Sequence, residues 1–118
     1  MSMDIEARTT DHSLPLAIAD ELNRMEANLA YMNADVTGYK QLCRCVERMK
    51  TVLQTYGYEM VSLLGQTYTD GMRVVAHFVI DEEMESDAPP RITGVSKPQV
   101  NFEGHMIQVA QVTVSIPL

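Results

Sequence analysis

Apolar residues at alternating steps of four and three constrain the first half of this chain more than any other feature. Heptad spacing of this kind places all of its members along one side of an α-helix. The residues between them are mostly Asp, Glu, Asn, Arg and Lys, so this side alone is suited to burial. We call this set the heptad seam. Its members are Ile18, Leu22, Met25, Leu29, Met32, Val36, Tyr39, Cys43 and Val46.

The helical segment is predicted to span residues 13–57, after a short polar tail at 1–12. Ser13 is the expected N-cap, and Pro15 is tolerated because a first-turn N–H has no helical partner. Gly38 interrupts the pattern and costs about 1 kcal/mol of helix propensity. The sequence therefore allows one long helix with a weak point there, or two helices that form a hairpin. Gly57 is the expected C-cap, which ends the helical segment.

A seam of this width needs a surface to cover it. A heptad period is what coiled-coil pairing requires, and this favours a second copy of the chain in a dimeric coiled coil or four-helix bundle. The alternative is an amphipathic helix that lies on a sheet of its own chain.

Residues 58–118 are predicted to form a small all-β domain, so the expected fold class is α+β. Asp70-Gly71 precedes the first β-branched run, and Glu103-Gly104 is the expected turn of a hairpin. The acidic run 81–87 lacks the ligand spacing of a calcium loop and leads into two prolines, so it is predicted to be a solvated loop. The predicted strands are 74–80, 92–95, 100–102, 106–107 and 110–116.

Composition excludes several classes of protein. The net charge is −7 and there is no Trp, which argues against a nucleic-acid binder, since that class needs a basic surface and stacking aromatic residues. No run approaches the roughly 18 apolar residues of a membrane span. The acidic start does not resemble a signal peptide, and two cysteines do not make a disulfide framework. A cytoplasmic location is the expectation.

No group of residues predicts catalysis. His12, His77 and His105 lie in the predicted tail, a strand and a turn, and none has a partner at the spacing of a triad or a zinc site. Cys43 is on the seam and Cys45 is off it, so neither is expected to do redox or metal chemistry. A β part of about 50 residues is too small to enclose a pocket of several hundred Å³. We expect no enzyme, no metal and no cofactor.

Four stretches of the sequence resemble one family in the order in which they occur. Residues 92–115 resemble the closing segment of the GrpE family, in which a valine-rich strand, a turn and a Val-x-Val-Ser strand follow one another. Residues 39–60 are similar to the second bundle helix of the family and its exit. Leu63–Tyr68 resembles the lead-in to the β domain, and residues 14–24 resemble the first bundle helix. The resemblance spans residues 14–116.

GrpE proteins are nucleotide exchange factors of DnaK-type chaperones. The resemblance implies that this chain binds the nucleotide-binding domain of such a chaperone and promotes ADP release without a catalytic residue of its own. It also implies a homodimer, in which the heptad seam builds a four-helix bundle. The partner-binding positions that it implies are Ser96, Lys97, Pro98, Gly104, His105 and Gln108.

The chain departs from the family at several positions. The motif Asp-Pro-x-x-His-Glu-Ala is replaced around Arg73, and Gln99, His105 and Gln108 differ from the residues usual beside the turn. The long paired-helix stalk of the family has no counterpart before the bundle region. The alternative function is a homodimeric adaptor or structural module without exchange activity.

Overall fold

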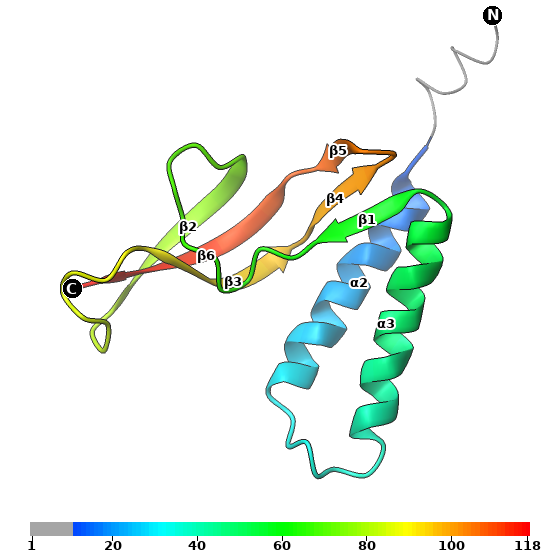
Figure 1. The fold of residues 1–118 in the computed structure, drawn as a ribbon, viewed down its shortest axis with the longest axis horizontal. Coiled ribbons are helices and arrows are strands. Elements are labelled where there is room, and N and C mark those ends of the chain that lie inside the picture. Colours follow the sequence, from blue (N-terminus) through cyan, green and yellow to red (C-terminus); the bar gives the residue numbers. More distant parts are fainter. Residues whose placement is uncertain (1–10) are drawn as a thin grey trace, which may run out of the picture.

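The structure is a computed structural model that describes residues 11–118, and it has an α+β fold. Within these residues, two helices, α2 (Ser13–Ala30) and α3 (Tyr39–Thr55), precede the strands and pack side by side as a hairpin (Figure 1). The predicted α+β class is confirmed. Of the two helical arrangements that the sequence allows, one long helix or a hairpin, the hairpin is the correct one. The strands that follow are β1 (Tyr58–Val61), β2 (Val74–Asp81), β3 (Arg91–Lys97), β4 (Gln99–Phe102), β5 (His105–Gln108) and β6 (Ala110–Pro117).

Helix α2 begins one residue earlier than the predicted cap implies, because His12 is the N-cap and Ser13 is already helical. The Ser13 backbone N–H donates to the Asp11 carboxylate at 2.9 Å. Hydrogen bonds from Ser13 hold the pKa of Asp11 below its ordinary value. Residues 1–10 of the predicted tail lie outside the described residues.

The prediction that Met32 and Val36 lie on the helical seam is wrong, because the break between the two helices begins earlier than at Gly38. Helix α2 ends at Ala30, so Met32 and Val36 lie in an exposed loop and not on a helix. The local cause is a turn at Asn33, whose side-chain oxygen accepts the Asp35 N–H at 2.9 Å and whose carbonyl accepts the Val36 N–H. Gly38 then enters α3 with φ of 89°, a value that favours glycine.

Helix α3 ends at Thr55 with Tyr56 as its C-cap, two residues before the predicted end at Gly57. Gly57 has φ of 94°, and its N–H donates to the Gln54 carbonyl at 2.9 Å. A side chain here would also meet the Phe102 ring, which lies 3.1 Å from the position that a Cβ would take. The chain therefore reverses tightly at Gly57 and enters β1, a strand that the sequence analysis did not predict.

In residues 11–118, six strands form two small sheets, in the orders β1-β4-β5 and β2-β6-β3. All predicted strands are present, and the hairpin turn at Glu103 and Gly104 has φ values of 49° and 84°. Only Pro98 separates β3 from β4, and only Val109 separates β5 from β6, so these pairs pass directly from one sheet to the other (Figure 1). Strand β2 runs parallel to β6, whereas β3 is antiparallel to it.

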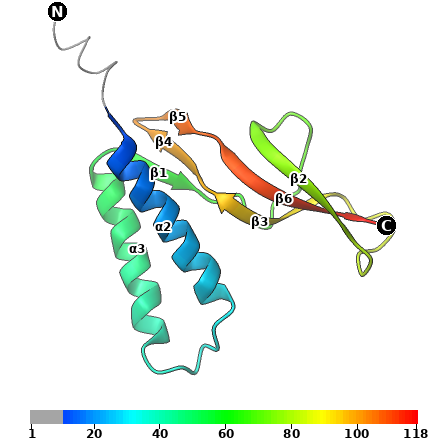
Figure 2. The same cartoon turned by 180° about the vertical axis from the view of Figure 1, so that it is seen from behind.

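Each sheet has its own core. The first core joins the helical hairpin to the first sheet, and the second lies under the other sheet, which extends away from the helices (Figure 2). The principal extents are 57 × 41 × 16 Å, so the molecule is flat. The first core contains Ala19, Leu22, Leu29, Val46, Leu53, Tyr58 and Val100, and the second contains Leu63, Ile92, Ala110, Val112 and Val114.

The seam residues therefore divide into three groups. Leu22, Leu29 and Val46 are buried inside the chain, against the other helix and the first sheet. Ile18, Tyr39 and Cys43 are half-buried around the same core, and Met25, Met32 and Val36 are exposed. A sheet of the same chain covers the inner part of the seam, which is the arrangement that the sequence analysis gave as the alternative.

Candidate interaction surfaces

The tip of the β4–β5 hairpin is an exposed turn held beside the end of α3. Gly104 and His105 are exposed there. The Glu103 backbone N–H donates to the Gly57 carbonyl at 2.9 Å, which fixes the tip against the helix exit. His105 and the turn are thus presented on a rigid support.

An aromatic cluster lies next to this tip. The Phe102 ring is 4.7 Å from the Tyr58 ring and 4.7 Å from the His12 imidazole, measured between ring centroids. The His12 Nδ1 atom and the Tyr58 hydroxyl share a hydrogen bond of 2.7 Å. Burial, followed by the negative charges of Asp11 and Glu103, raises the pKa of Tyr58 above its ordinary value. The phenol stays protonated at neutral pH and can keep this bond.

Three other predicted partner-binding residues lie where β3 passes into β4. Ser96 is exposed and its hydroxyl donates to the Gln111 carbonyl at 3.1 Å. Lys97 is half-buried and Pro98 is buried. The four residues of β4 separate this junction from the hairpin tip, a distance of about 13 Å at the usual rise per residue. The predicted residues therefore form two separate places on the surface.

Gln108 connects the first sheet to α2. Its Nε2 group donates to the Asp20 carboxylate and to the Pro98 carbonyl, both at 2.9 Å. These contacts use both hydrogens of the amide, so the side chain holds the β3–β4 junction in place and has no free donor for a partner.

We expect Gln108→Ala to lower the free energy of unfolding by about 1–2 kcal/mol, because the Pro98 carbonyl and Asp20 both lose a half-buried donor. Urea unfolding followed by circular dichroism measures this change. Gln111→Ala, which alters an exposed side chain on β6, is the control and should change stability by less than about 0.5 kcal/mol. Equal stability of the two variants would contradict the positioning role.

A second apolar stripe runs along the outside of α3, and the sequence analysis missed it. Its large members are Leu42, Met49, Val52 and Tyr56, which are 45%, 43%, 55% and 72% exposed, with the half-buried Cys45 between them. These positions follow one another at steps of three and four, as the seam positions do. Within the described residues, nothing in the chain covers this surface, which we call the outer α3 stripe.

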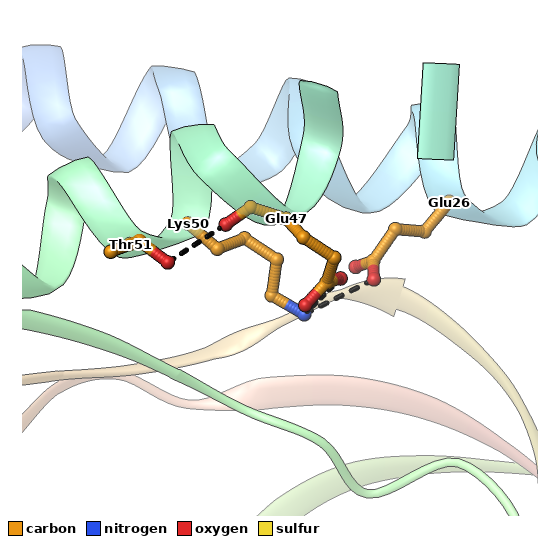
Figure 3. A network of polar contacts seen from close by, with 4 residues as sticks. All are labelled: Glu26, Glu47, Lys50 and Thr51. Atoms are coloured by element: carbon orange, nitrogen blue, oxygen red, sulfur yellow. Dashed lines mark hydrogen bonds and ion pairs between the residues drawn. The ribbon is translucent and has the colours of Figure 1, made fainter. Parts of the chain in front are cut away.

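A groove of about 240 Å³ lies between the C-terminal half of α2 and the strands β1 and β3. The Lys50 ammonium stands at its wall, 3.1 Å from the Glu26 carboxylate on α2 and 3.7 Å from Glu47 on its own helix (Figure 3). The backbone carbonyl of Glu47 accepts a hydrogen bond of 3.0 Å from the Thr51 hydroxyl. Partly exposed ion pairs of this kind contribute at most about 1 kcal/mol to the free energy of unfolding. The Lys50–Glu26 pair therefore orients the two helices more than it stabilises them. The groove is smaller than an ordinary substrate pocket.

Among residues 11–118, no three His, Cys, Asp or Glu side chains come together in a way that could hold a metal ion. Cys43 and Cys45 are free thiols. No helix in this part of the chain is both long enough and apolar enough to cross a bilayer. The sequence matches no protein-family model and no curated protein.

Proposed function

We propose that this protein is a GrpE-like nucleotide exchange factor, which binds the nucleotide-binding domain of a DnaK-type chaperone and promotes ADP release. The supporting observation is that residues 92–115, which resemble the family most closely, form one continuous run of strands from β3 to β6. This run presents the β3–β4 junction, where Ser96 is exposed, at one end of β4 and an exposed turn at the other.

The mechanism needs binding energy only. A protein that binds the open, nucleotide-free form of the chaperone more tightly than the closed form shifts the population toward the open form. Contacts to ADP are broken in that form, so ADP leaves faster. By linkage, nucleotide lowers the affinity for the exchange factor by the same factor, which releases it again.

The candidate contact residues can be ranked by their accessibility. Ser96, Lys97, Gly104 and His105 offer surface to a partner. Pro98 and Gln108 act by positioning the junction, because the first is buried and the second donates both of its amide hydrogens inside the chain.

The proposal includes a homodimer, and the exposed apolar residues suggest which surface forms it. The inner seam residues Leu22, Leu29 and Val46 already lie in the core of one chain, so they are poor candidates for contact with another. The outer α3 stripe is a better candidate, because it has heptad-like spacing and remains accessible. The helical hairpin of a second copy would complete a four-helix bundle there.

The test is stopped-flow release of a fluorescent ADP from a DnaK-type chaperone of the same organism, with and without the protein. We expect dose-dependent acceleration of ADP release. The double variant Lys97→Ala/His105→Ala should accelerate release at least about tenfold less, because truncation of central interface residues usually has an effect of this size. Lys40→Ala removes an exposed charge on α3, away from both places, and serves as the control.

Light scattering of each variant checks that the assembly is unchanged. Full acceleration by Lys97→Ala/His105→Ala would contradict the assignment of these residues. No acceleration with any chaperone of the organism would contradict the exchange function and leave the homodimeric adaptor as the better description.

A further inference from the structure

Strand β2 lies at the edge of the second sheet, and among the described residues no strand pairs with its outer side. All eight of its residues are in regular parallel register with β6, without a bulge. Val75, Phe78 and Ile80 are 59%, 48% and 61% exposed. Proteins usually protect a long apolar edge with Lys, Pro, a bulge or a covering loop. The sequence of β2, VVAHFVID, has no Lys and no Pro.

Opposite charges mark the two ends of this edge. Arg73 immediately precedes β2 and is exposed, and Asp81 is its last residue. Two antiparallel copies of β2 related by a twofold axis through His77 would place Arg73 of each copy opposite Asp81 of the other. A twofold axis between adjacent antiparallel strands is perpendicular to the sheet, so each face of one copy continues the same face of the next. Of the registers that this symmetry allows, only the one centred on His77 pairs these charges.

The side chains between the charged ends also fit this register. Ala76 would face Phe78 of the second copy, a small residue against a large one, and Val75 would face Val79. Val74 would face Ile80, one of the most exposed apolar residues of the strand. Cross-strand pairs of apolar and oppositely charged residues each contribute roughly 0.2–1 kcal/mol, and every pair occurs twice in a symmetric dimer.

We propose that the β2 edge is a self-recognition surface, which pairs antiparallel with β2 of a second copy of this chain in the register centred on His77. The two sheets then join into one sheet of six strands. This surface lies on the second sheet, apart from the outer α3 stripe, so it goes beyond the proposed exchange function and does not depend on it. A chain that uses both surfaces builds assemblies larger than a dimer, since each surface recruits a different copy.

Cysteine crosslinking tests the register. In a background with Cys43→Ala and Cys45→Ala, His77→Cys places a thiol directly opposite its own symmetry mate, about 4.5–5.5 Å away between Cα atoms, and this spacing permits a disulfide. Val75→Cys is the matched control, because it lies on the same face of the same exposed strand but faces Val79 of the other copy. We expect mild oxidation to give a covalent dimer at least about tenfold faster for His77→Cys. Equal rates, or a faster reaction of Val75→Cys, would overturn this register.

Charge exchange tests the pairing itself, by analytical ultracentrifugation of the full chain over a range of concentrations. Arg73→Asp and Asp81→Arg each replace two attractive contacts with two repulsive ones, and each should weaken the β2 association about tenfold or more. The double variant Arg73→Asp/Asp81→Arg restores opposite charges and should recover the original affinity. Unchanged association in both single variants, or a double variant that associates as poorly as either single one, would overturn the proposal.

Discussion

We expect Leu22→Ala to lower the free energy of unfolding by about 3 kcal/mol, the largest stability effect of any single truncation in α2. Leu22 is 1% exposed, in the core between the two helices and the first sheet. Replacement of a fully buried leucine by alanine removes its transfer free energy and leaves a cavity that the surroundings fill only in part, which together cost about 2–5 kcal/mol. Urea unfolding followed by circular dichroism measures the loss.

The neighbouring seam residue Met25 provides the control. It lies on the same helix and was assigned to the same predicted interface, but it is 37% exposed. We expect Met25→Ala to cost less than about 1 kcal/mol. The contacts of Leu22 lie within one chain, so the loss of unfolding free energy in Leu22→Ala should not depend on protein concentration. It should be the same at roughly 2 µM and roughly 200 µM protein, a range over which a contribution from dimer formation would change. A loss that shrinks as the protein concentration rises would instead place Leu22 between two chains.

The coarse fold could be predicted because the relevant signals are local. The change from helical spacing to β-branched runs locates the boundary near Gly57, and the Glu103-Gly104 turn is specified by two residues. Strand β1 could not be predicted in the same way. Its sequence, Tyr-Glu-Met-Val, is short and has weak alternation, and it becomes a strand because Tyr58–Val61 pairs with β4, about 40 residues further along the chain.

The covering of the heptad seam also depends on contacts that sequence spacing does not contain. Helix α3 has apolar residues in two adjacent registers, one with Tyr39, Cys43 and Val46, and the other with Leu42, Met49 and Val52. Periodicity shows that each register lies on one side of a helix, but not which side meets the first sheet. The position of α2 and the sheet turns the first register inward and leaves the second accessible. Met32 and Val36 have seam spacing but lie outside the helices for a more local reason. Asn33 forms a turn just after the end of α2, and apolar spacing alone does not reveal this turn.

The candidate partner-binding residues were predicted from sequence similarity, and their three-dimensional arrangement was not. Residues 96–98 and 104–105 are close in sequence, yet β4 holds them at opposite ends of one short strand. Gln108 points toward α2, where Asp20 accepts its amide at 2.9 Å. A contact across 88 residues has no signature in the local pattern, so the sequence could not show that the Gln108 amide is held against α2.

The double variant Met49→Glu/Val52→Glu should convert a helix-mediated homodimer into a monomer. Both side chains belong to the outer α3 stripe and are 43% and 55% exposed in the single chain, so their substitution leaves the core intact. In a dimer that uses this stripe, each substitution would bury two carboxylates in the interface, one from each copy. We expect the dissociation constant to rise at least about 1,000-fold, which corresponds to ~4 kcal/mol. Light scattering in an Arg73→Asp background, in which the β2 edge associates weakly, measures the change as a fall toward the 13.2 kDa mass of one chain.

A second variant separates the stripe from helix α3 as a whole. Gln41→Glu/Gln54→Glu adds the same two negative charges to the same helix at exposed positions that are already polar. This control should keep the mass of the parent protein, and both variants should keep its circular dichroism spectrum, since the buried residues Val46 and Leu53 are untouched. If Met49→Glu/Val52→Glu also keeps the mass of a dimer, the chain must associate through a different surface.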